Sequence, residues 1–119
     1  MYQENVVLCG ASAYEEKFYL NPDFNLLPES IKQELKIICV LFTVDVGGVL
    51  TLEFDEEGRL QLKVDVREDD LLFDEIGSAL KIKQLQNERK ELFESLEMFY
   101  RVFFLEETDG LDIPDITEE

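Results

Sequence analysis

The sequence predicts an α+β fold in which an antiparallel sheet of about three to five strands has one face covered by two helices. Three observations lead to this prediction. Residues 49–54 and 59–66 alternate between apolar and polar side chains, which is typical of the two strands of a hairpin. Residues 28–45 and, separately, 83–104 repeat their apolar side chains at helical spacing. A hairpin alone is unstable in water, so we expect the helices and further strands to pack with it.

The N-terminal segment is expected to supply the further strands. Residues 6–9 are apolar and β-forming, and residues 14–20 are rich in aromatic strand formers. The small residues 10–13 between them indicate a break, and the Asn-Pro-Asp of residues 21–23 is typical of a turn. We therefore expect one or two strands here that join the sheet of the hairpin.

The helix predicted at 28–45 has recognisable start and stop signals. Pro28 is tolerated at the first helical position, and the carboxylate of Glu29 favours the positive end of the helix dipole. The glycines at 47–48 supply a left-handed stop. Every residue in 37–42 is apolar, so we expect the second half of the helix to be surrounded by protein, although the same run also fits a buried strand. Any apolar surface left uncovered would form a homodimer interface.

The register of the hairpin follows from its alternation. A three-residue loop at 56–58, with Gly58 in the left-handed conformation, pairs Asp55 with Arg59. The next pairs are then Phe54 with Leu60, Leu52 with Leu62, and Leu50 with Val64. A two-residue loop would put the two apolar sets on opposite faces of the sheet, so we reject it.

The chain after the hairpin is expected to contain two helices. The acidic residues 68–70 precede the apolar residues 71–76, which are predicted to form a short helix that ends at Gly77. Residues 79–82 fit either a helix or an extended segment. The last helix, at 83–104, carries an aromatic stripe that we assign to the core and not to a ligand site: Phe93, Phe99, Tyr100 and Phe103.

The acidic residues are concentrated in two segments. The chain has 28 acidic and 11 basic residues, which gives a formal net charge of -17. Residues 48–72 hold eight acids and three bases, and residues 106–119 hold seven acids and no base, so these segments carry -5 and -7. We therefore expect one α+β domain at 1–105, followed by a disordered acidic tail at 106–119.

The composition excludes several classes of function. A chain this acidic is repelled by nucleic acid and by anionic membrane surfaces, so we expect neither as a partner. The chain has no histidine, which excludes the Ser-His-Asp and Cys-His catalytic designs. With two separated cysteines it also excludes an ordinary structural zinc site. We expect no cofactor and no metal.

The cysteines and the lack of targeting signals predict a cytoplasmic protein. Cys9 and Cys39 each lie inside an apolar run, which is typical of buried thiols, although a disulfide between them is an alternative. The N-terminus has neither the basic start nor the apolar core of a signal peptide, and no run approaches the roughly 18 apolar residues of a membrane span.

Two clusters of carboxylates are the candidate partner-binding residues. One lies at the hairpin tip and one follows the second hairpin strand: Asp55, Glu56 and Glu57, and Glu68, Asp69 and Asp70. Such clusters also offer oxygen ligands to Ca²⁺ or Mg²⁺, but neither has the spacing of an EF-hand loop. The structural alternative, which we favour over a cation site, is that these side chains cap helices and fill a solvated turn.

Four stretches of the sequence resemble a family of small acidic proteins from clostridia and related Gram-positive bacteria. They are VVLCGASAYEEKFY at 6–19, LPESIKQELKIICVLFT at 27–43, VGG at 46–48 and DEIGS at 74–78. The likeness runs over residues 1–105. That family has no assigned activity, so the resemblance implies a bacterial cytoplasmic protein and assigns no functional residue.

Two functional hypotheses follow from these observations. The first is a non-enzymatic interaction or regulatory module whose acidic surface binds a basic protein partner, with residues 106–119 speeding the association. The second is a small-ligand-binding domain or a carboxylate-based enzyme, with an acid or base in a pocket between sheet and helix. The carboxylates considered for that pocket are Glu15, Glu16, Asp74 and Glu75.

Overall fold

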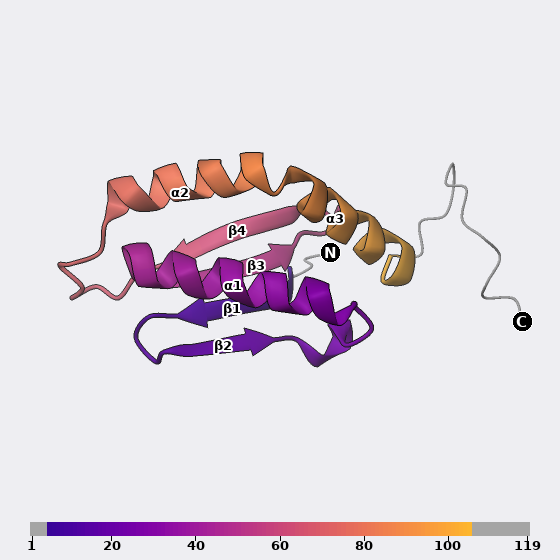
Figure 1. The fold of residues 1–119 in the computed structure, drawn as a ribbon, viewed down its shortest axis with the longest axis horizontal. Helices are drawn as coiled ribbons and strands as arrows, with labels where there is room; N and C mark the ends of the chain where they lie inside the picture. The colour runs from indigo at the N-terminus through magenta and orange to yellow at the C-terminus, as the bar shows by residue number, and fades with distance from the viewer. Residues whose placement is uncertain (1–4, 106–119) are drawn as a thin grey trace, which may run out of the picture.

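The computed structural model describes residues 5–105 as an α+β fold, which confirms the predicted class (Figure 1). Its four-stranded antiparallel sheet has the order β2-β1-β3-β4, and the helices lie against one face. The strands are β1 (Val6–Ser12), β2 (Lys17–Leu20), β3 (Val49–Phe54) and β4 (Leu60–Asp65). The helices are α1 (Glu29–Val46), α2 (Glu75–Glu88) and α3 (Lys90–Phe103), with a 3-10 turn, η1, at Pro22–Phe24. The tail predicted at 106–119 lies outside the described residues.

The β3–β4 hairpin has the predicted register. Phe54 pairs with Leu60, Leu52 with Leu62, and Leu50 with Val64. Gly58 has a φ of 84°, a left-handed conformation that a side chain would disfavour, which is why the alternation and the glycine together select this loop. The apolar set faces the helices and forms the centre of the core, where Leu50, Leu52 and Phe54 are fully buried.

The predicted break at residues 10–13 is wrong, because β1 continues to Ser12. Gly10 is needed inside the strand: a Cβ there would lie 2.8 Å from the carbonyl oxygen of Leu50 on β3. The chain turns only at residues 13–16, where the Ser12 hydroxyl accepts hydrogen bonds from the amides of Tyr14 and Glu15. The small residues therefore serve close strand packing and not a break.

Helix α1 begins and ends within a residue of the predicted positions, and the strand alternative is wrong. Leu35, Cys39 and Phe42 are fully buried or nearly so against the sheet. The expectation that the second half would be surrounded by protein is also wrong. Ile37, Leu41 and Val44 are 51%, 54% and 72% exposed, because no other element of the described chain covers the outer side of α1.

Residues 66–89 differ most from the prediction. Asp74 caps α2 by accepting a hydrogen bond from the Gly77 amide at 2.8 Å, so a helix begins where we expected one to end. Residues 79–82 are helical, and the helix predicted at 83–104 is two helices that meet at Arg89, whose φ and ψ are -112° and 28°. Helix α2 has Ser78 as its one buried residue and packs beside α1, whereas α3 turns its aromatic side onto the sheet. The chain must change direction between these two packing partners.

The core contains the expected aromatic side chains of α3 and one that the sequence did not single out. Tyr100 stacks on Phe54 with ring centroids 4.3 Å apart, and Phe24 of η1 stacks on Phe104 at 4.7 Å. Phe103 is 53% exposed, so the predicted stripe is only partly core.

The two cysteines are buried free thiols, as predicted, with their sulfur atoms 3.8 Å apart. The hydrogen bond with Cys39 and the burial of the site both raise the pKa of the Cys9 thiol. Both side chains therefore act as small apolar groups that join β1 to α1.

Candidate functional site

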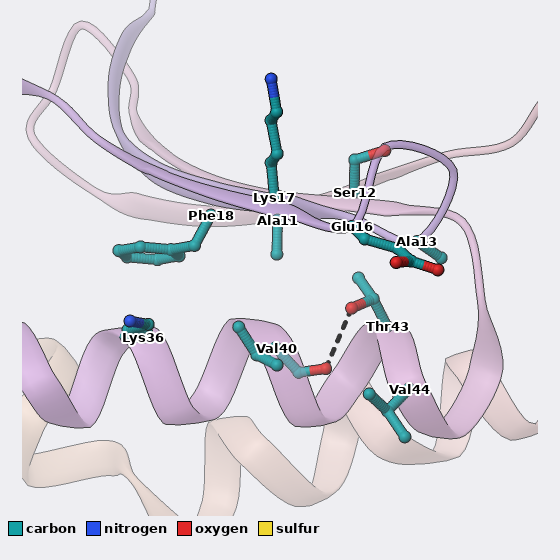
Figure 2. A pocket seen from close by; sticks show the side chains of 10 residues that line it. All are labelled: Ala11, Ser12, Ala13, Glu16, Lys17, Phe18, Lys36, Val40, Thr43 and Val44. Atoms are coloured by element: carbon teal, nitrogen blue, oxygen red, sulfur yellow. Dashed lines mark hydrogen bonds between the residues drawn. The ribbon is translucent and has the colours of Figure 1, made fainter.

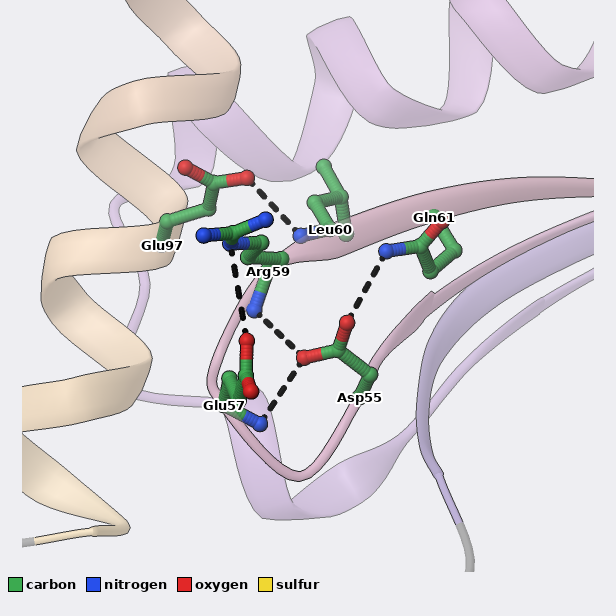
Figure 3. A network of polar contacts seen from close by, with 6 residues as sticks. All are labelled: Asp55, Glu57, Arg59, Leu60, Gln61 and Glu97. Carbon is green, nitrogen blue, oxygen red and sulfur yellow. Dashed lines mark hydrogen bonds and ion pairs between the residues drawn. The ribbon is translucent and has the colours of Figure 1, made fainter.

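The hairpin tip is held together by the carboxylate of Asp55. This carboxylate accepts hydrogen bonds from the amides of Glu57 and Arg59, each at 2.9 Å, and from the side-chain amide of Gln61 at 3.0 Å (Figure 3). Partial burial acts to raise the pKa of Asp55, but these hydrogen bonds outweigh it and hold the pKa below its usual value. Asp55 therefore stabilises the turn, as the structural alternative predicted.

The other carboxylates near the tip differ in how they contact the domain. Glu57 lies 3.8 Å from Arg59 in an ion pair whose side chains are both about 70% exposed, so the pair adds little stability. Glu97 of α3 accepts a hydrogen bond from the Leu60 amide at 2.8 Å and joins the helix to β4. Glu56 is exposed.

At the opposite end of the hairpin, the loop between β4 and α2 is bound to the β1–β2 turn. The Tyr14 hydroxyl donates a hydrogen bond to Asp70 at 2.6 Å and accepts one from the Arg67 amide at 3.1 Å. The Arg67 guanidinium lies 4.3 Å from the centre of the Tyr14 ring, a cation–π contact. Asp70 also accepts a hydrogen bond from the Leu72 amide at 3.0 Å. These contacts bring together two segments that are more than fifty residues apart in sequence.

The result is a concentration of carboxylates that we call the acidic end. It is formed by the β1–β2 turn, the C-terminus of α1, the loop after β4 and the start of α2 (Figure 1). Its members are Glu15, Glu16, Asp45, Glu68, Asp69, Asp70, Asp74 and Glu75. Asp45 pairs with Lys81 at 2.8 Å, and Asp70 and Asp74 bond to the backbone. The remaining carboxylates are exposed, so they create a negative potential at this end of the molecule.

Exposed apolar side chains lie among these carboxylates. Leu71 and Leu72 are 92% and 93% exposed, and Ile76 at the start of α2 is 76% exposed. All three lie in the short helix predicted over 71–76, so the pattern did not identify them as functional candidates. The signal in the sequence was the apolar run at 71–73, which acidic residues flank directly on both sides. An apolar patch with a polar rim is typical of an interaction site.

A groove of about 640 Å³ lies between α1 and the β1–β2 hairpin. Phe18 and Val40 face each other across it, and Lys17 points away from it (Figure 2). Of the carboxylates proposed for a pocket, Glu16 lines this groove, whereas Asp74 caps α2 elsewhere. The four carboxylates therefore do not converge on one pocket. Within residues 5–105 no group of three or more acidic or cysteine side chains is placed to hold a metal ion.

The Tyr14–Asp70 hydrogen bond should make part of the stability depend on pH. The Tyr14 hydroxyl is the main cause that lowers the pKa of Asp70, and the same bond raises the pKa of Tyr14. A lowered carboxyl pKa stabilises the fold above the ordinary value of about 4, and this contribution is lost as the pH falls through the folded-state pKa. The raised pKa of Tyr14 has the opposite pH dependence. It stabilises the fold below the ordinary tyrosine value of about 10, and this contribution is lost as the pH rises through the folded-state pKa.

We therefore expect Tyr14→Phe to destabilise the protein at neutral pH and to have a smaller effect near pH 3. Urea titrations of the variant and the parent chain at both pH values measure this difference. Tyr19→Phe is the matched control, because the Tyr19 ring is 54% exposed and its hydroxyl has no hydrogen bond within the described chain. A Tyr14→Phe effect that is equal at both pH values would contradict the assignment.

A family model described as a family of unknown function, DUF6145, matches residues 5–108. The chain belongs to this family. The match covers every helix and strand described above, so the DUF6145 domain includes the acidic end, the hairpin tip and the groove. No curated protein and no solved structure matches the chain. No helix within residues 5–105 is long and apolar enough to cross a membrane.

Proposed function

We propose that this DUF6145 protein is a non-enzymatic interaction module that binds a basic protein partner through its acidic end. The observation that carries the proposal is the near-complete exposure of Leu71 and Leu72 at the end of the molecule where exposed carboxylates gather. Burying an exposed leucine in an apolar pocket contributes about 1.5–3 kcal/mol, so the pair can anchor a complex. The partner has an apolar pocket with a rim of Lys or Arg side chains.

The carboxylates supply speed and selectivity in this proposal. Glu68 and Asp69 flank the leucines, and Glu15, Glu16 and Glu75 extend the negative surface around them. Such a surface steers a basic partner to the site and repels acidic proteins, and its effect weakens as salt screens the charges. Removal of residues 106–119 is expected to slow association for the same reason.

The acidic end supports this role better than the hairpin tip. Asp55 uses its carboxylate to hold the turn, and Glu57 is paired with Arg59. No exposed large apolar side chain lies at the tip between them. The tip therefore supplies a matched control in which acidic residues are changed without touching the leucine anchors.

We place the protein in a bacterial cytoplasm as part of the same proposal. Two features support this location. The buried thiols of Cys9 and Cys39 suit a reducing compartment, and the sequence resembles small acidic proteins from clostridia and related Gram-positive bacteria.

The experiment compares four full-length baits in cell extract: the parent chain, Leu71→Ser/Leu72→Ser, Glu68→Gln/Asp69→Asn, and the tip control Glu56→Gln/Glu57→Gln. A true partner is retained by the parent and the tip control and is lost from both acidic-end variants. With the purified partner, the leucine variant should raise the Kd at least about tenfold, equivalent to 1.4 kcal/mol, at any salt concentration. The charge variant should lose affinity mainly at low salt.

Circular dichroism checks that each variant is folded, which we expect because the changed side chains are exposed. A partner whose affinity is unaffected by both acidic-end variants would overturn the proposal. So would equal loss of binding with the tip control, because acidity in general would then be responsible.

A further inference from the structure

Strand β2 is an edge strand with unpaired backbone groups. The sheet order places β2 outermost, beside β1 only. The Asn21 amide donates to the Leu8 carbonyl at 2.9 Å, and hydrogen-bonded pairs alternate along an antiparallel ladder. Tyr19 and Lys17 therefore also bond to β1. The backbone N–H and C=O groups of Phe18 and Leu20 point away from the sheet, where no described strand pairs with them.

Partly covered apolar side chains lie on both sides of this edge. On the helix side, Phe18 and Val40 line the open groove between β2 and α1. Ile37, Leu41 and Val44 continue this surface over the outer side of α1. On the other face of the sheet, the Tyr19 ring is 54% exposed. An unpaired edge flanked by apolar surface favours the addition of another strand.

Charge identifies which strand can be added. Lys17 is the one charged residue of β2. On α1, Asp45 is paired with Lys81 and Glu34 is paired with Arg89, whereas Lys36 beside the groove has no ion-pair partner within residues 5–105. Glu16 also lines the groove, and its carboxylate offsets part of the charge of Lys17 and Lys36. This edge is thus close to neutral in a chain of net charge -17, and two copies can approach here with less repulsion than at the acidic end.

We propose that a second copy of this chain binds at β2, so that the two sheets join through an antiparallel β2–β2 pair. The outward backbone groups determine the register. A two-fold axis at Tyr19 places Phe18 of each copy opposite Leu20 of the other, and each such pair exchanges two backbone hydrogen bonds. The two Tyr19 side chains then face each other in a non-hydrogen-bonded pair, and each α1 covers the groove beside the joined strands. The surface borders the acidic end at the β1–β2 turn, where Glu16 lines the groove, but it includes neither Leu71 nor Leu72, so this proposal does not depend on the proposed function.

The register can be tested by a disulfide at the two-fold axis. Cα atoms in a non-hydrogen-bonded pair are about 4.5 Å apart, within the range that a disulfide spans. We expect Tyr19→Cys to give a covalent dimer under mild oxidation with glutathione. Lys63→Cys, an exposed position on the opposite edge strand β4, is the matched control and should stay monomeric. Cys9 and Cys39 are buried and do not compete.

Sedimentation equilibrium tests the association without a covalent bond. The full-length parent chain should dimerise with concentration, and Tyr19→Lys should raise the dimer Kd about tenfold or more because like charges would face each other. Exchange of the Phe18 and Leu20 amides should slow as the dimer forms. A parent chain that stays monomeric at high micromolar concentration would overturn the proposal, as would equal cross-linking at positions 19 and 63. It would also be overturned if dimers form only after removal of residues 106–119, since the chain's own C-terminal segment would then occupy the edge.

Discussion

Phe24→Ala is expected to lower the free energy of unfolding by about 3–5 kcal/mol. Phe24 is fully buried, and its ring packs against Phe104 at 4.7 Å, Phe54 at 5.8 Å and Tyr100 at 6.4 Å. It therefore joins the turn after β2 to the centre of the sheet and to the end of α3. Removal of the ring would leave a cavity that these elements, fixed by their own contacts, cannot fill.

Urea unfolding of the parent chain and the variant measures this effect, and the slope of each transition checks that both unfold cooperatively. Phe103→Ala is the matched control on α3, because its ring is 53% exposed and its loss should cost less than about 1 kcal/mol. A loss below about 1 kcal/mol for Phe24→Ala would mean that the end of α3 does not pack on the turn after β2.

The second large effect is expected at the glycine pair that ends α1. Gly47 has a φ of 87° and a ψ of -169°, a region that is essentially restricted to glycine. Gly47→Ala should therefore cost about 1–3 kcal/mol through backbone strain alone. Gly48 has a φ of 74°, and a Cβ there would also lie 3.0 Å from the Phe73 ring and 3.1 Å from the Asp65 carbonyl oxygen. Gly48→Ala should lower the free energy of unfolding by a similar amount, because it adds both backbone strain and crowding against Phe73 and Asp65.

A second background separates strain from crowding. In a Phe73→Ala chain the crowding at Gly48 is relieved, so the cost of Gly48→Ala should fall, whereas the cost of Gly47→Ala should be nearly unchanged. Thermal or urea unfolding of the six proteins measures both differences. If both glycine substitutions cost less than about 0.5 kcal/mol, the turn between α1 and β3 must differ from the one described.

The features that local pattern predicted well are those whose cause is local. The hairpin register depends on the alternation of Leu50 to Val64 and on the left-handed Gly58, and both lie within one short segment. The same is true of α1, where helical spacing and the glycines at 47–48 set its position within one residue. Neither prediction required knowledge of what the elements pack against.

The errors occurred where a distant segment decides the local conformation. The small residues 10–12 suit either a break or a strand that packs closely on its neighbour. They form a strand because β3 lies close to Gly10, a contact that the local sequence does not show. The last helix is divided at Arg89, whose side chain pairs with Glu34 on α1, because α2 packs beside α1 and α3 packs on the sheet. The apolar run of α1 was read as fully buried because periodicity does not show which side of a helix has a neighbour.

The candidate site shows the same division. The carboxylates at 68–70 were selected from composition, but their association with Glu15 and Glu16 depends on the Tyr14–Asp70 hydrogen bond between distant segments. The exposure of Leu71 and Leu72 likewise depends on Asp74 starting α2 beyond them.

The sequence by itself determined the α+β class, the hairpin and its register, the first helix and the exclusion of histidine chemistry, because short-range spacing and composition control these properties. Only the tertiary structure decided which carboxylates share a surface, which leucines remain exposed and which strand edge remains unpaired. Those properties depend on contacts between residues far apart in the chain, and the free energy of such contacts leaves little trace in any local pattern.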